Sequence, residues 1–104
     1  MRIDYERSGG FANIQLRCHV NTESMPQDQV EELLEIVESS KVFEIQQSEV
    51  TPVAGGGPPD VFSYRLSLSE GDRQKTLSFN DVTAPTSLRP LLGILQRMAL
   101  EQKR

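Results

Sequence analysis

The sequence predicts an α+β domain: an antiparallel sheet of four to five strands with two helices packed on one face, in the order ββαβββα. Short segments that alternate apolar and polar residues are typical of strands that bury one face. Two longer segments repeat apolar residues at helical spacing, which favours amphipathic helices. Because each strand has a single apolar face, both helices are expected on the same side of the sheet. The 104 residues are predicted to form one domain, residues 1–104, without an internal repeat.

The first two strands are predicted to form a hairpin. Ile3 and Tyr5 alternate with polar residues, and the same alternation recurs from Ile14 to Val20. The connecting loop, residues 8–13, contains two glycines followed by Phe11. An aromatic ring at a glycine-flanked turn either folds back onto the sheet edge or is displayed for a partner, because loops on a rigid sheet are common binding sites.

The first helix is predicted to begin with Ser24 as its N-cap and Pro26 in its first turn. Its buried stripe follows helical spacing and comprises Val30, Leu33, Leu34 and Val37. The outer face is acidic and has no lysine or arginine among Glu31, Glu32, Glu35 and Glu38. Such a run is usually a solvated helix face, although it also suits a basic partner.

Three further strands are predicted in the second half of the chain. The third begins at Phe43 and Ile45 and runs toward Val50. A glycine- and proline-rich segment, residues 51–60, follows and ends in Asp60. The fourth strand buries Phe62, Tyr64, Leu66 and Leu68, and a turn at residues 69–73 leads to a fifth that buries Leu77 and Phe79. Asp60 itself is either a turn residue that bonds nearby amides or a binding group.

The second helix is predicted to begin with Ser87 as its cap, which places Pro90 in the first turn, where a missing N–H is tolerated. Its buried stripe comprises Leu88, Leu91, Leu92 and Leu95, extended by Met98 or Ala99. One arrangement of the sheet brings the Phe11 turn, the Gly/Pro segment and residues 80–84 to the same end. The last of these segments contains Asp81. The sequence is compatible with this arrangement without requiring it.

Composition argues against several classes of partner. The net charge is −4 and the pI about 4.9, so phosphate backbones are poor partners and nucleic acid is not expected. No apolar run approaches the roughly 18 residues of a membrane span, and no secretory signal pattern follows Met1. Cys18 is the only cysteine, which excludes an intrachain disulfide and suits a reducing compartment. We therefore expect a cytoplasmic protein, monomeric when free.

The chain lacks the residue patterns of an enzyme. His19 and Cys18 are neighbours in a predicted strand, so they point to opposite faces and cannot act as base and nucleophile. Cys18 is expected in the core, and His19 on the polar face. No metal-binding spacing is present, and the triple glycine at residues 55–57 is not followed by Gly-Lys-Ser/Thr. We therefore expect neither catalysis nor a cofactor.

Three motifs carry a resemblance to a known family: RSGGFANI from Arg7, PPDVFSYRL from Pro58 and APTSLRPLLGIL from Ala84. Together and in this order they resemble the emfourin family, small bacterial protein inhibitors of thermolysin-type, protealysin-like metallopeptidases. The resemblance spans about Ile3 to Leu95. It implies a mechanism with two loops: an aspartate from one coordinates the catalytic zinc of the protease, and apolar residues from the other occupy its substrate subsites.

The resemblance places these roles on particular residues of this chain. The protease-binding positions are Gly9, Gly10, Phe11, Ala12, Pro59 and Asp60. Asp60 is the ligand expected for the protease zinc, with Asp81 as the alternative, and Phe11 is the apolar plug. The competing hypothesis is a non-catalytic regulatory adaptor that binds a basic partner through the acidic helix.

Overall fold

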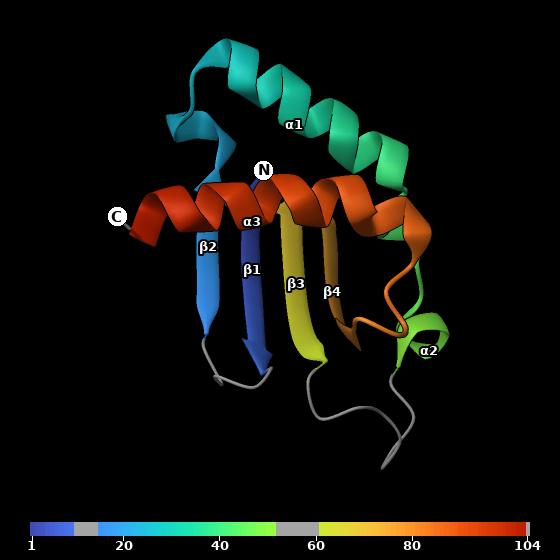
Figure 1. The fold of residues 1–104 in the computed structure, drawn as a ribbon. Helices are drawn as coiled ribbons and strands as arrows, with labels where there is room; N and C mark the ends of the chain where they lie inside the picture. The colour runs from blue at the N-terminus through green and yellow to red at the C-terminus, as the bar shows by residue number, and fades with distance from the viewer. Residues whose placement is uncertain (10–14, 52–60, 104) are drawn as a thin grey trace.

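The computed structural model describes residues 1–9, 15–51 and 61–103. Four strands form one antiparallel sheet in the order β2-β1-β3-β4 (Figure 1). Their bounds are β1 Arg2–Gly9, β2 Leu16–Asn21, β3 Phe62–Glu70 and β4 Arg73–Asn80. The helices are α1 Gln27–Ser40, the short α2 Gln47–Val50 and α3 Arg89–Lys103, with 3-10 turns at Thr22–Ser24, Val42–Glu44 and Thr86–Leu88. The predicted α+β class is confirmed.

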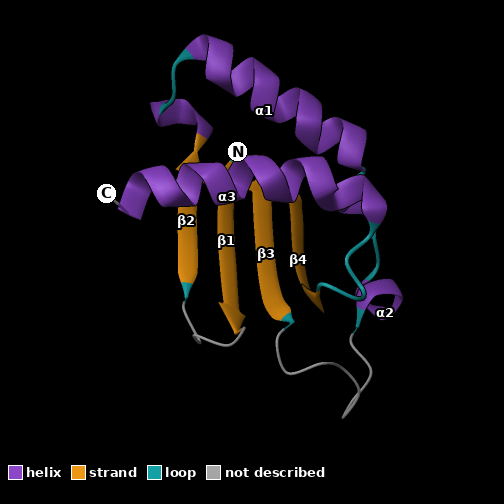
Figure 2. Cartoon of the chain, viewed as in Figure 1, coloured by secondary structure: helices purple, strands orange, loops and turns teal. Residues whose placement is uncertain are grey.

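A single core lies between the sheet and the two long helices, which lie on the same face of the sheet (Figure 2). Strand β2 shows the pattern most clearly, since Leu16, Cys18 and Val20 are buried and the residues between them are exposed. Most of the α3 stripe is confirmed, since Leu88, just before the helix, and Leu91, Leu95 and Ala99 within it are fully buried. Leu92, also predicted to be buried, is half-buried at the edge of the core. Among the described helices, none is long and apolar enough to cross a bilayer.

The predicted strand from Phe43 to Val50 is wrong. Lys41 ends α1 in the left-handed conformation with φ 55°, and the chain then forms a 3-10 turn and the four-residue α2. The backbone N–H of Gln46 donates to the Glu49 carboxylate at 2.8 Å, one half of a capping box that satisfies amides at the start of α2. Val42 and Val50 are both buried. The apolar residues therefore anchor a compact connection and do not add a fifth strand.

Both predicted N-caps are also wrong. Ser24 lies in the 3-10 turn that precedes α1, and Pro26 is the residue before the first helical turn, with no side-chain cap. Ser87 likewise lies in a 3-10 turn, and α3 begins at Arg89. Pro90 falls in the first turn of α3, as predicted, where it removes no intrahelical hydrogen bond.

Each edge strand pairs with the side chain of a glutamine. On β4, the Gln47 carboxamide accepts from the Ser78 N–H and donates to the Ser78 carbonyl, both at 2.8 Å. On β2, Gln102 accepts from the His19 N–H at 3.2 Å and donates to the His19 carbonyl at 2.9 Å. At each edge, a carboxamide thus makes the two hydrogen bonds that a residue of a neighbouring strand would make. Unpaired backbone groups on an edge strand can otherwise pair with another chain.

Candidate functional site

The sheet register brings three sequence segments to one end of the sheet, which we call the loop end. Gly9, the last residue of β1, pairs with Phe62, the first residue of β3. Ser63 pairs with Asn80, the last residue of β4. The described residues that flank segments 10–14 and 52–60 therefore lie beside residues 80–84, at the lower edge of the sheet in Figure 1. The described residues agree with the arrangement that the sequence left open, while the Phe11 turn and residues 52–60 lie outside them.

Gly9 allows the end of β1 to lie close to the residues at the start of β3. Its φ of +102° is a conformation that side chains rarely adopt, and a Cβ built on it would lie 3.1 Å from the Val61 carbonyl oxygen. Val61 directly follows the Gly/Pro segment. Glycine therefore favours this close approach of the end of β1 to the start of β3, because any side chain here would strain the backbone and press on Val61.

Asp81 clamps the first residue of β3. Its backbone N–H donates to the Phe62 carbonyl at 3.2 Å, and its carboxylate accepts from the Phe62 N–H at 2.8 Å. The other carboxylate oxygen accepts from the Tyr64 hydroxyl at 2.6 Å. Phe62, two residues after segment 52–60, thus has both of its backbone hydrogen-bonding groups bonded to Asp81.

The Tyr64 ring is itself held by aromatic packing. It stacks on Phe79 with 5.4 Å between ring centroids and lies tilted against Tyr5 at 6.3 Å. Burial, followed by the hydrogen bond to Asp81, raises the pKa of Tyr64, so the hydroxyl remains a donor to the carboxylate. Beside it, the Arg7 guanidinium lies over the Phe62 ring, 4.3 Å from the centroid. Side chains from β1, β3 and β4 therefore pack against one another at the loop end.

The sequence-predicted site residues divide into two groups. Gly9 and Asp81 lie at the loop end as just described. The others lie outside the described residues: Gly10, Phe11, Ala12, Pro59 and Asp60.

Sequence reasoning missed Arg7 and Tyr64 as parts of this end. Tyr64 was interpreted as core packing, and its hydroxyl contact with Asp81 depends on a cross-strand neighbour that the sequence does not identify. It also missed the turn built by Asn80, whose side chain accepts from the N–H groups of Val82 and Thr83, both at 2.9 Å. Asparagine readily bonds to amides that follow it, so the Asn80-Asp81 pair was the available signal.

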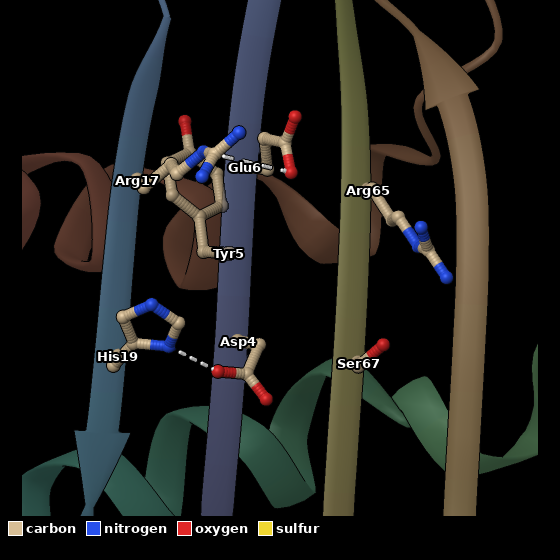
Figure 3. Close-up of a pocket in the computed structure, with 7 residues that line it drawn as sticks. All are labelled: Asp4, Tyr5, Glu6, Arg17, His19, Arg65 and Ser67. Atoms are coloured by element: carbon tan, nitrogen blue, oxygen red, sulfur yellow. Dashed lines mark hydrogen bonds and ion pairs between the residues drawn. The ribbon is translucent and has the colours of Figure 1, made fainter.

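On the opposite face of the sheet, where the described part of the chain places no helix, lies a hollow lined mostly by polar residues (Figure 3). Its lining residues are Asp4, Tyr5, Glu6, Arg17, His19, Arg65 and Ser67. His19 Nδ1 contacts Asp4, and Arg17 lies 3.9 Å from Glu6. These pairs are exposed, as is typical of a solvated sheet face.

Cys18 is fully buried on the other face, and burial raises the pKa of its thiol to about 11, so it is confirmed as a core residue.

Comparisons with known proteins bear directly on identity. No curated protein matches the chain, and no solved structure matches it. Residues 5–96, however, match the family described as Emfourin. The match covers β1 from Tyr5 onward, all of β2, β3 and β4, and the first half of α3, and it includes Arg7, Gly9, Tyr64 and Asp81. The resemblance seen in the three motifs is thereby confirmed, and the chain belongs to the emfourin family, whose members inhibit metalloproteases and are not enzymes.

Proposed function

We propose that this protein inhibits a thermolysin-type, protealysin-like zinc metallopeptidase by placing the loop end of its sheet in the active-site cleft. The observation that carries the proposal is the pairing of Gly9 with Phe62. Gly9 directly precedes the segment that carries Phe11, and Phe62 lies two residues after the segment that carries Asp60. Two chemically different groups can then act on one cleft from a single rigid support.

The aspartate acts on the metal of the target. A catalytic zinc keeps one coordination position for water, and a carboxylate oxygen can take that position at roughly 2.0–2.2 Å. Displacing the water removes the nucleophile that attacks the peptide bond. The zinc belongs to the protease, so the inhibitor alone needs no metal.

The aromatic ring acts on the substrate subsites. Burying the Phe11 side chain in an apolar subsite contributes on the order of 2–3 kcal/mol, with Ala12 extending the contact. Neither this contact nor the zinc bond gives tight inhibition alone. Mounted on adjacent strands, the two groups bind together because folding has already fixed the distance between their supports.

Asp60 is the zinc ligand in this proposal, and Asp81 is the alternative. Both Asp81 oxygens already accept hydrogen bonds, from Phe62 and Tyr64, so Asp81 has a structural role that accounts for its position. Asp60 has the match to the PPD motif in its favour. A carboxylate retains further lone pairs when it accepts two hydrogen bonds, so experiment must separate the two residues.

The test is an inhibition assay with a thermolysin-type protease and a peptide substrate. The wild-type protein should abolish cleavage at near-stoichiometric amounts. Phe11→Ala and Asp60→Ala should each weaken inhibition while leaving the circular dichroism and the unfolding midpoint unchanged. If Asp60→Ala inhibits normally and Asp81→Asn does not, the zinc ligand is Asp81. If the wild-type protein inhibits none of a panel of such proteases, the proposed mechanism is wrong.

The adaptor hypothesis rests on the acidic face of α1. Glu31, Glu32 and Glu35 are exposed, and Arg73 lies 3.5 Å from Glu38, the last glutamate of this face. Reversing the first three residues to lysine separates the two functions. An adaptor would lose its basic partner, whereas the inhibitor should change mainly in association rate and salt dependence.

We also infer that the free protein is a cytoplasmic monomer. The glutamines that pair with the edge strands support the monomer, because they occupy the backbone groups through which two sheets would join. The single buried thiol of Cys18 suits a reducing compartment.

A further inference from the structure

Val82 is an apolar side chain held out at the loop end. It is 68% exposed, the highest value among the large hydrophobic residues that the structure describes. The other exposed large hydrophobic residue in this part of the chain is Leu100, 48% exposed near the end of α3. Single exposed apolar residues are common on surfaces, so the exposure of Val82 matters only in combination with its support and its position.

The support is a tightly bonded turn over residues 80–84. The Asn80 side chain is nearly buried and accepts from the N–H groups of Val82 and Thr83. The Asn80 N–H donates to the Thr83 hydroxyl at 3.1 Å, and the Ala84 N–H donates to the Asn80 carbonyl at 2.9 Å. Four hydrogen bonds thus fix the backbone that carries Val82.

The position of the turn is fixed as well. Asp81, the residue before Val82, bonds both backbone groups of Phe62 and the Tyr64 hydroxyl. Val82 therefore extends from the same turn that holds Phe62, the first residue of β3. A rigid apolar side chain loses little conformational entropy on binding, which favours its use as a contact.

We propose that residues 80–84 form a third contact element of the inhibitor, in which Val82 packs against the apolar rim of the active-site cleft of the target metallopeptidase. Asn80 is the positioning residue that holds Val82 in place. This inference rests on the proposed function, because it assumes that the loop end enters the cleft. It adds a contact beside the zinc ligand and the aromatic plug.

The first experiment compares Val82→Asp with Leu100→Asp in the same inhibition assay. Each substitution places one carboxylate at an exposed apolar position, so their effects on net charge are matched, and the unfolding midpoint of each variant is measured alongside. Val82→Asp should raise the inhibition constant by about tenfold or more, since a desolvated charge is placed in an apolar contact. Leu100→Asp should leave it unchanged. Equal inhibition by Val82→Asp and wild type would overturn the inference.

The second experiment tests the positioning role of Asn80. Asn80→Ala removes the acceptor of the Val82 and Thr83 amides and should raise the inhibition constant mainly through faster dissociation. Asn80→Asp retains an acceptor oxygen and should restore most of the affinity. A variant that combines Asn80→Ala with Val82→Asp should be no weaker than Val82→Asp alone. Additive losses would show that Asn80 does not act through Val82.

The outcome for this inference is separable from that for the proposed function. If the wild-type protein inhibits and Asp60→Ala fails while Val82→Asp inhibits fully, the zinc mechanism stands and the third contact is wrong. If Val82→Asp weakens inhibition while Asp60→Ala and Asp81→Asn do not, the third contact stands and the zinc mechanism is wrong.

Discussion

The two ends of the sheet differ in how their side chains are satisfied. At the end where β3 turns into β4, which we call the turn end, Arg73 contacts Glu70 and Glu38 and lies over the Phe43 ring, 4.4 Å from the centroid. The Arg73 guanidinium is therefore already engaged by side chains of the protein itself. At the loop end, Val82 extends into solvent and Asp81 braces the exit of segment 52–60. This contrast agrees with the proposed function, in which the loop end makes the contact with the protease and the turn end contributes to stability.

The two ends also differ in what requires their glycines. Gly71 has a φ of +57° with no atom within 4 Å of a built Cβ, so only backbone conformation requires it. Gly9 has a φ of +102° and also faces the Val61 carbonyl at 3.1 Å. The first glycine shapes a turn between consecutive strands, whereas the second brings together two segments far apart in the sequence.

The largest expected effect comes from the buried core near the turn end. Leu68→Ala, at a position only 2% exposed, should lower the free energy of unfolding by about 2–5 kcal/mol through lost burial and the cavity left behind. Urea unfolding measures this loss, and inhibition per folded molecule should be unchanged. Tyr64→Phe is the comparison at the loop end. It should cost only about 1 kcal/mol and yet weaken inhibition, because Asp81 loses the Tyr64 hydroxyl. If Leu68→Ala weakened inhibition per folded molecule and Tyr64→Phe did not, the assignment of inhibition to the loop end would be wrong.

The two glycines give the next largest effect. Ala at either position should destabilise the protein by about 1–2 kcal/mol, because both backbones lie at positive φ. Gly71→Ala should inhibit normally, whereas Gly9→Ala must also displace Val61 and should weaken inhibition. Gly71→Asn serves as the control for backbone conformation, since asparagine tolerates the left-handed region. If Gly9→Ala inhibits as well as Gly71→Ala, the close approach of β1 and β3 is not needed for binding.

The glutamines at the sheet edges should give a smaller effect. Gln47→Ala and Gln102→Ala each remove two hydrogen bonds to a backbone residue of an edge strand, Ser78 or His19. Each should lower stability by about 1 kcal/mol and promote self-association at high concentration, measured by sedimentation velocity. Inhibition by the monomer should persist, because the edges are distinct from the loop end. Variants that remain monomeric at all concentrations would show that the glutamines do not protect the edges.

At neutral pH the smallest effect concerns Cys18. Burial, and secondarily the Asp4 carboxylate, raises the pKa of this thiol from 9.0 to about 11, so it should resist iodoacetamide in the native state and react after denaturation. Below pH 9 both the folded and the unfolded chain retain the proton. Between pH 9 and about 11 the unfolded chain releases it first, so the free energy of unfolding should fall as pH rises.

Cys18→Val is the matched control for that pH dependence. It keeps an apolar side chain in β2 and should lack the part of the decline that belongs to the thiol, leaving the part due to Tyr5 and Tyr64, whose pKa values burial also raises. Gly9→Ala should leave the thiol protected if its effect is confined to the loop end. Rapid alkylation of native Gly9→Ala would mean that the effect of this substitution reaches the core and is not confined to the loop end.

Much of the fold could be predicted from local patterns, and the failures are instructive. The alternation in β2 and the main residues of the α3 stripe were predicted correctly, because in each the spacing of apolar residues repeats over several residues. The segment from Phe43 to Val50 was not, because its apolar residues lack regular spacing and their burial is decided by contacts with the rest of the core. The helix caps failed for a related reason: 3-10 turns precede both α1 and α3 and shift where each helix begins.

By itself, the sequence determined which face of each strand and helix is buried, and its three motifs identified the family, because both depend on residues close together in the chain. Only the tertiary structure decided that β1 pairs with β3, since that contact joins residues more than fifty positions apart and depends on burial of the whole core. The same pairing brings Gly9, Asp81 and Val82 to one end. A functional surface assembled from distant segments follows from the strand order, which local periodicity leaves undetermined.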